Sequence, residues 1–378
     1  MKEPFPYDMR AVVVAAGKAL SLKKIFAASF YLVAGYLLYT AVTYLALLYD
    51  GVSFAYIRQS YGLFPLRFFP FDSIVARGIH FLGLPLAAIC LSSAIMAVAV
   101  ITFEELRGNV FYSSAKAIRL AFRRLPTLVF GYLSIAALVG IVYLLGVITG
   151  FVGRIPILGD LLIGVFYIIP IFFTLVFTVF VIFIGCVGLV LLPVIIAAQR
   201  TRDLFDALLH LFSVVIRQPV RFFWYLILSA GLAKIASFIL AYFFFRTLQF
   251  SRLMLVQGGG AKLERMFNAA MDMLPLNSPV TLFVTTLFPG VRFGFSLSRW
   301  GYGGEPTLGA YLLAMSFFRL FMVVAGYLVA IVAGGLARGY VVIRRLKDGH
   351  AIIEEPPLEP IDDLATPPFG TDPSPADE

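Results

Sequence analysis

Residues 171–198 read IFFTLVFTVFVIFIGCVGLVLLPVIIAA, a run of 28 residues without a charged side chain. A helix needs about 20 apolar residues to cross roughly 30 Å of hydrocarbon, so this run predicts a transmembrane span. The apolar character reaches back to Leu161, and one helix over 161–198 would be about 57 Å long at ~1.5 Å per residue. Because proline interrupts helices, we expect 161–169 to be an interfacial piece, broken at Pro170 from a tilted span.

Five more stretches are long and apolar enough to cross a bilayer. The six predicted spans are 25–48, 81–103, 127–149, 171–198, 222–245 and 308–334. Hydrophobic residues make up 61% of the 378 residues and charged residues 13%, whereas soluble domains have about 45–50% and about 25%. We therefore predict an all-α polytopic integral membrane protein. The run from Ile25 to Tyr49 is too long for a signal-peptide core and should remain as an anchor.

The distribution of Lys and Arg predicts the orientation. With six spans, the segments on the side of the two termini carry 18 basic residues and the segments on the other side carry 10. By the positive-inside rule both termini should be cytoplasmic. Counting the apolar segment 279–299 as a seventh span would place the basic residues after 334 outside, against the rule. We expect that segment to be interfacial or re-entrant.

The net charge of +9 conceals a split between a membrane domain, 1–353, and an acidic tail. Residues 354–378 contain eight acidic side chains, seven prolines and no Lys or Arg, which leaves +17 on the rest. The tail composition predicts a disordered, solvated cytoplasmic segment. The basic excess is spread over many short loops, which is typical of contact with anionic lipid headgroups and not of nucleic-acid binding.

A basic segment with helical periodicity precedes the first, third and fifth spans. In 203–217, polar residues recur at steps of three and four with apolar residues opposite, and 113–124 is similar. The version at 9–20 is weaker. The second and third end at Pro126 and Pro219, where the helix should stop and the chain turn into the membrane. The predicted unit, repeated three times, is an interfacial amphipathic helix, a span outward and a span back.

Two interpretations of these helices remain open. In the first, the helices bind anionic lipid of the inner leaflet; in the second, they only cap the bundle. The candidate lipid contacts are Lys116, Arg119, Arg123, Arg124, Arg217 and Arg221.

The chain resembles a known group over roughly residues 100–245. The relevant runs are Ser113-Ser114-Ala115-Lys116-Ala117-Ile118, Leu192-Pro193-Val194-Ile195, Leu204-Phe205-Asp206-Ala207-Leu208-Leu209 and Ile216-Arg217-Gln218-Pro219. They resemble bacterial inner-membrane proteins grouped with the membrane domain of glycerophosphodiester phosphodiesterases. The resemblance implies a fold and an inner-membrane location. It implies no catalytic residue, because the soluble phosphodiesterase domain is absent from this chain.

Two long segments lie on the predicted outer side. Residues 49–80 are rich in aromatic side chains, which indicates either an interfacial belt or a docking surface for a partner. In 246–307, an apolar stripe at helical spacing predicts a helix on the outer surface. This stripe either packs on the bundle or binds a protein partner. The stripe consists of Leu263, Met266, Phe267, Ala270, Met271 and Leu274.

Ionisable side chains inside spans are costly and therefore indicate functional sites. Lys234 and Arg319 lie near the middle of the fifth and sixth spans, and no Asp or Glu falls inside any predicted span. They are candidates for binding an anion such as a lipid phosphate. We expect no catalytic residue, metal or cofactor, because neither a metal-ligand spacing nor a nucleophile triad is present.

The sequence thus favours a non-enzymatic structural or lipid-interacting component of an envelope assembly. The alternative is a transporter or lipid-handling permease, with Lys234 and Arg319 holding an anionic group at mid-membrane. A polar cavity lined by both residues would favour transport.

Overall fold

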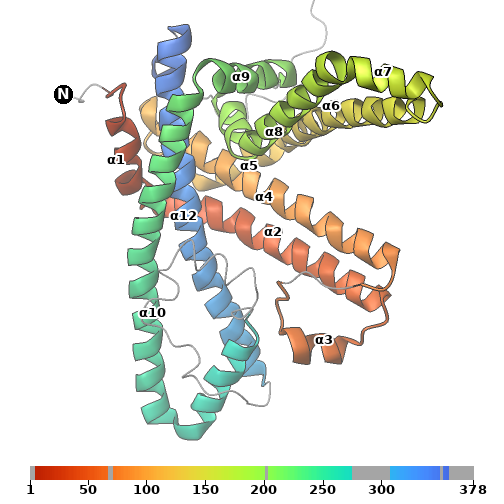
Figure 1. The fold of residues 1–378 in the computed structure, drawn as a ribbon. Coiled ribbons are helices and arrows are strands. Elements are labelled where there is room, and N and C mark those ends of the chain that lie inside the picture. The colour runs from red at the N-terminus through yellow and green to blue at the C-terminus, as the bar shows by residue number, and fades with distance from the viewer. Residues whose placement is uncertain (1–4, 67–70, 201–202, 275–306, 350–351, 357–378) are drawn as a thin grey trace, which may run out of the picture.

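The computed structural model describes residues 5–66, 71–200, 203–274, 307–349 and 352–356 (Figure 1). Within these ranges every regular element is a helix, and six helices are long and apolar enough to cross a membrane. The prediction of an all-α polytopic protein is confirmed. The six are α2 (Leu22–Tyr49), α4 (Ile74–Leu106), α6 (Leu125–Val152), α8 (Phe173–Ala198), α10 (Pro219–Asp272) and α12 (Leu308–Asp348). The predicted extra segment 279–299 lies outside the described residues.

The three predicted amphipathic helices are present as α1 (Arg10–Ala19), α5 (Ser114–Arg123) and α9 (Leu204–Arg217). Ser113 caps α5 by accepting a hydrogen bond from the backbone of Lys116, and Asp203 caps α9 by accepting from Phe205 and Asp206. Pro126 and Pro219 stand in the first turns of α6 and α10, where a helix tolerates the missing N–H. The two prolines therefore mark the ends of α5 and α9 as predicted, whereas α1 ends without one.

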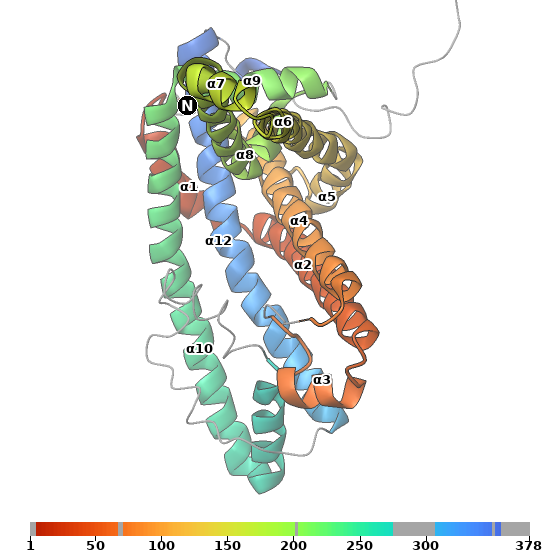
Figure 2. The same ribbon diagram turned by 45° about the vertical axis from the view of Figure 1, so that its right-hand side comes forward.

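The three units close into a ring. The units are α1–α2–α4, α5–α6–α8 and α9–α10–α12. Each amphipathic helix packs on the hairpin of the preceding unit: α5 on α2 and α4, α9 on α6 and α8, and α1 on α10 and α12. We call the region where these three helices meet the adjoining ends of the long helices the hub; from it the three hairpins diverge (Figures 1 and 2).

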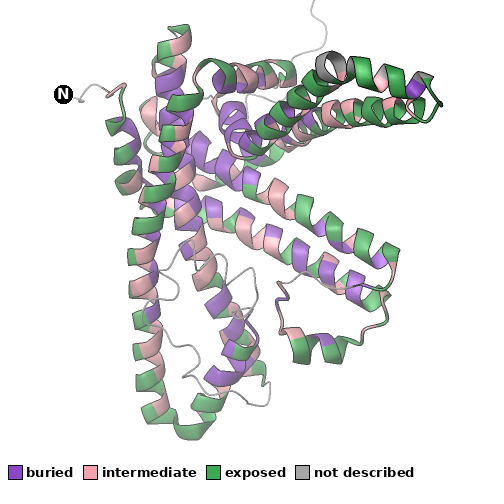
Figure 3. Cartoon of the chain, in the orientation of Figure 1, coloured by how far each residue is buried: buried purple, intermediate pink, exposed green. Residues whose placement is uncertain are grey.

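The helices that return to the hub form its centre. In α4, α8 and α12, 56%, 56% and 61% of the most apolar window is buried, against 39%, 6% and 22% in α2, α6 and α10. Buried residues concentrate where the helices converge, and the distal part of the α6–α8 hairpin is largely exposed (Figure 3). The outward helices therefore form the layer that faces the surroundings.

Small residues allow a close helix crossing between α10 and α12. A Cβ added at Gly335 would collide with the Ser229 hydroxyl, and one added at Gly339 would lie 2.9 Å from the Tyr225 ring. The similarly spaced Gly146 and Gly150 on α6 have nothing within 4 Å of an added Cβ. Two glycines four residues apart therefore lie at a helix contact on α12 but on open surface on α6.

The predicted break at Pro170 is wrong. The chain stays helical from α7 (Leu158–Phe166) through a π-helical turn, η1 (Tyr167–Phe172), into α8. A π turn occurs as a single wider turn inside an α-helix, and here it continues the helix through the predicted break.

The described parts of both predicted outer segments pack on the bundle. Residues 49–80 contain α3 (Phe54–Tyr61), and Phe64 stacks on Phe318 of α12 with ring centroids 4.4 Å apart. Gly260 has φ +58° and turns the chain within α10. The predicted stripe follows: Phe267, Ala270, Met271 and Leu274 are buried, in one cluster with residues at the start of α12. Much of this apolar surface is therefore used within the chain.

Candidate functional site

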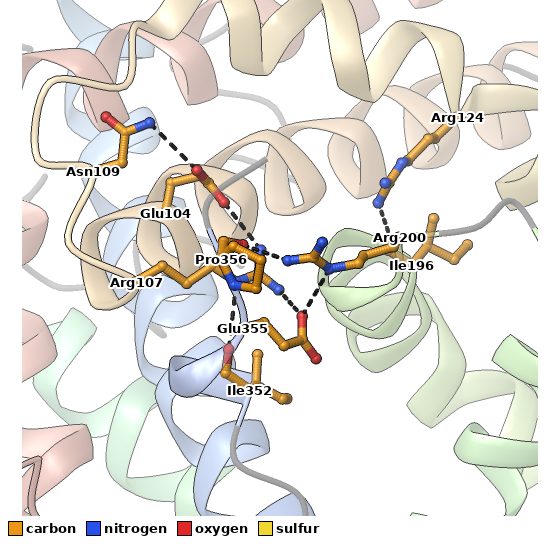
Figure 4. Close-up of polar contacts among 9 residues, drawn as sticks. All are labelled: Glu104, Arg107, Asn109, Arg124, Ile196, Arg200, Ile352, Glu355 and Pro356. Atoms are coloured by element: carbon orange, nitrogen blue, oxygen red, sulfur yellow. Dashed lines mark hydrogen bonds and ion pairs between the residues drawn. The ribbon is translucent and has the colours of Figure 1, made fainter. Parts of the chain in front are cut away.

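A partly buried ion-pair network, which we call the clasp, joins the three units at the hub (Figure 4). Glu104 at the end of α4 is fully buried, and its carboxylate lies 3.0 Å from Arg107 Nη1. Arg107 Nη2 lies 2.5 Å from the carboxylate of Glu355, in the segment after α12. Arg200, which follows α8, lies 3.4 Å from the same carboxylate. Four side chains thus connect the ends of all three returning helices.

The clasp is surrounded by further hydrogen bonds. Asn109 donates to the second oxygen of Glu104 at 3.5 Å, and Arg107 Nε donates to the Ile352 carbonyl at 3.4 Å. Arg124 donates to the carbonyl of Ile196 at the end of α8. Buried charges are tolerated only when they are paired and hydrogen-bonded, and removing one partner typically costs about 3–5 kcal/mol. The clasp should therefore hold the hub in one arrangement.

The clasp corrects the predicted boundary of the tail. The tail was predicted to begin at Glu354, but Glu354 ends a short 3₁₀ turn and pairs with Arg345 at 3.2 Å. Glu355 follows it in the clasp. Residues 357–378 lie outside the described residues, so the prediction of disorder there stays a prediction.

A second charge cluster lies at the start of α2. Lys24 is 1% exposed, and its Nζ lies 2.6 Å from Glu105 of α4, while Lys23 Nζ lies 2.8 Å from the other oxygen of the same carboxylate. Lys23 also donates to the Val110 carbonyl at 2.7 Å, and Lys24 to the Lys18 carbonyl at 3.4 Å. This cluster connects α1, α2, α4 and the loop before α5.

A polar pocket of about 680 Å³ opens beside this cluster. Its charged lining consists of Lys18, Lys23, Glu105 and Arg338, which together carry a net +2. Ser21 and Ser113, the residues before the first turns of α2 and α5, also line it. Tyr112 lies there too, and burial, the largest influence, raises its pKa to about 12, so the phenol stays neutral. We call this cavity the basic pocket.

A second cavity, of about 650 Å³, lies between α6 and α8 and is apolar. Gly146 and Gly150 leave room on α6. The few polar side chains of the wall are Tyr143, Thr149, Tyr167, Thr174 and Thr178. It contains no charged side chain in its lining. A site of this kind suits hydrocarbon chains and not an ion.

The structure does not bring Lys234 and Arg319 together. Ser229 packs against Gly335, and Phe245 against Phe321 at 5.2 Å between ring centroids, which sets the antiparallel register of α10 and α12. Arg319 is then level with about residue 246, roughly 18 Å along the axis from Lys234 at ~1.5 Å per residue. Both side chains are exposed, and neither lines the basic pocket or the apolar cavity.

Five of the six predicted lipid-contact residues are exposed at the hub. These are Lys116, Arg119, Arg123, Arg217 and Arg221. Arg124 is 3% exposed and is bonded to Ile196, so it is a bundle contact and not a lipid contact. Its position follows from the helical turn, because the buried face of α5 also contains Ala117, Leu120 and Ala121.

Several charged residues of the hub were not predicted. Glu104 and Glu105 were assigned to a loop because the apolar run ends at Phe103, but α4 continues to Leu106 and carries both carboxylates in its last turn. Arg338 was assigned to the tail side of a span ending at 334, but α12 continues to Asp348. One feature of the sequence does indicate the cluster. Glu104-Glu105 directly follows the span 81–103 and Lys23-Lys24 directly precedes the span 25–48, so opposite charges lie at the same side of two neighbouring spans.

Comparisons with protein-family models, curated proteins and solved structures gave no match. Among the described residues, no group of three or more His, Cys, Asp or Glu side chains lies close enough together to hold a metal ion. The hub residues are therefore interpreted from their geometry alone.

Proposed function

We propose that the protein is a non-enzymatic integral protein of a bacterial inner membrane, with both termini cytoplasmic, and a structural, lipid-interacting component of an envelope assembly. The observation that carries the proposal is the two-sided character of the hub helices. One face of α5 is buried in the bundle while Lys116, Arg119 and Arg123 are exposed on the other. Exposed cations at the end of a membrane bundle each gain about 1 kcal/mol from anionic lipid.

Packing on the bundle and contact with lipid are thus compatible roles for the same helix. Arg217 and Arg221 extend the exposed basic surface to the α9–α10 junction. The excess of basic residues on the side of the termini favours the cytoplasmic leaflet for this face. The exposed side chains of Phe54 and Tyr56 on α3 support a partner contact at the opposite end.

Tryptophan quenching by brominated lipids would test the lipid contact. Trp224 is 56% exposed and lies one helical turn from Arg221, so it reports on lipid beside the cations. In a Trp300→Phe background, brominated phosphatidylglycerol should associate at least about threefold more strongly than brominated phosphatidylcholine, because two charges act nearby. The preference should weaken with added salt.

The double variant Arg217→Gln/Arg221→Gln should lose this preference. Lys262→Gln/Arg265→Gln is the matched control, because both residues are exposed at the far end of α10. An unchanged preference in the first variant, or equal quenching by the two lipids in the parent protein, would contradict the proposed lipid contact.

The transport alternative needs Lys234 and Arg319 in one polar cavity. Their separation along the helices and their exposure give no support to a shared anion site. We therefore place the lipid-interacting role first.

A further inference from the structure

The basic pocket contains an arginine with no hydrogen-bond or ion-pair partner among the described residues. Arg338 is 7% exposed and lines the pocket from α12. Within the described part of the chain it makes no hydrogen bond or ion pair, although it lies near enough to Glu105 to interact electrostatically. A buried guanidinium is normally matched to a carboxylate, phosphate or carbonyl. The opening beside it is where such a group would sit.

The carboxylate nearest to Arg338 is already satisfied. Glu105 accepts from Lys23 and Lys24 at 2.8 and 2.6 Å, one lysine on each oxygen. Lys18 adds a further cation to the pocket wall and is exposed. The pocket therefore keeps positive charge after its own acid is neutralised, which favours an anionic ligand.

Two helices begin at the same pocket. In the first turns of α2 and α5, the Lys24 N–H donates to the Ser21 carbonyl and the Lys116 N–H to the Ser113 hydroxyl. The N–H groups before them have no helical carbonyl to bond, and the positive end of each helix dipole points outward there. Ser21 and Ser113, which precede these turns, line the pocket together with Ser114. Backbone N–H groups, hydroxyls and a guanidinium together form a donor set that suits a tetrahedral phosphate.

The surroundings of the pocket indicate the source of the phosphate. Phe111 is 95% exposed and Leu20 62% exposed, and both line the opening. A soluble phosphate would gain nothing from these side chains, whereas a lipid would place glycerol and acyl chains over them. We propose that the basic pocket binds the phosphate group of a membrane phospholipid, with Arg338 as its main ligand. This inference rests on the proposed lipid-interacting function and gives it a defined site.

Thermal unfolding of the full chain in neutral detergent would test the site. Added phosphatidylglycerol should stabilise the protein saturably, while phosphatidylcholine of the same chain length, glycerol 3-phosphate and inorganic phosphate should stabilise it much less. Arg338→Gln should raise the apparent Kd for phosphatidylglycerol about tenfold or more, because a charge-assisted contact is lost.

Two further variants keep the test valid if Arg338→Gln does not fold. Ser114→Glu adds a carboxylate at the start of α5, which suits the helix dipole but repels phosphate, so the stable protein should lose the saturable response. Lys18→Gln, at an exposed position, should weaken binding by a few fold. Lys262→Gln is the control and should bind as the parent does.

The outcomes separate this site from the general lipid contact. Arg217→Gln/Arg221→Gln should retain saturable binding here, and Arg338→Gln should retain the lipid preference seen by Trp224. An unchanged Kd in both Arg338→Gln and Ser114→Glu would overturn the site. Equal binding of inorganic phosphate and phosphatidylglycerol would overturn its assignment to a lipid.

Discussion

Histidine 210 illustrates how single residues of the hub depend on their neighbours. Its Nε2 lies 3.2 Å from the Asp206 carboxylate, and Nη1 of Arg344, on α12, approaches Nδ1 at 2.9 Å and Nε2 at 2.5 Å. A guanidinium only donates, so this geometry fits a neutral ring that accepts from Arg344. Burial, followed by the Arg344 charge, lowers the pKa of His210 below its ordinary value of 6.5, with Lys347 acting in the same direction and Asp206 and Asp348 opposing.

This lowered pKa predicts a loss of stability in acid. Below pH 6.5 the unfolded chain takes up a proton at His210 that the folded protein resists, so stability should fall from pH 6.5 to the lowered pKa and then level off. Each unit of pKa difference corresponds to about 1.4 kcal/mol. Thermal unfolding midpoints at pH 7.5 and 5.5 should differ more in the parent protein than in His210→Gln. Equal differences would show that His210 is not responsible.

At the scale of elements, the sequence predicts what local physics determines. The length of the apolar runs locates the six long helices. Polar residues at helical spacing, preceded by the N-cap residue Asp203 or Ser113, locate α9 and α5. Helix ends are determined differently. Gly349, with φ +67°, ends α12 about fifteen residues past the predicted span. The apolar run stops earlier, but the helix continues until a residue in the left-handed conformation caps it.

The candidate site was missed for a related reason. The pairs Lys24–Glu105 and Arg107–Glu355 join residues far apart in the chain, which periodicity cannot reveal. Arg338 appeared to be one of several basic residues after a span, and only the packing of α12 buries it. Lys234 and Arg319 are candidates because they lie near the middle of their spans, but each lies on the exposed face of its helix.

The α10–α12 crossing gives the prediction at this scale. Gly335→Val should lower the free energy of unfolding by about 1–3 kcal/mol through overpacking against Ser229. Gly146→Val is the matched control on α6, where an added Cβ meets nothing within 4 Å. Thermal unfolding in mild detergent should separate the two variants. A similar loss of stability in both would mean that valine disturbs the helices themselves and not this crossing.

At the scale of the molecule, three hairpin units close on one another through their amphipathic helices, and the clasp ties their ends. The arrangement puts the clasp, the cluster of Lys23, Lys24 and Glu105, and both described ends of the chain at the hub. The α10–α12 hairpin is the longest: the 41 residues of α12 alone extend about 60 Å at ~1.5 Å per residue. That exceeds the roughly 30 Å hydrocarbon core, so the hairpin should project beyond the membrane opposite the hub.

Cysteine labelling tests most directly whether the hub faces the cytoplasm. Single cysteines would replace Arg10, Arg119 and Leu346 at the hub and Lys262 at the far end, all exposed, in a Cys90→Ser/Cys186→Ser background. In right-side-out spheroplasts, a membrane-impermeant maleimide should modify the cysteine at 262, and the three hub cysteines only after permeabilisation. Modification of the hub cysteines in intact spheroplasts, or opposite accessibility of positions 10 and 346, would contradict the account.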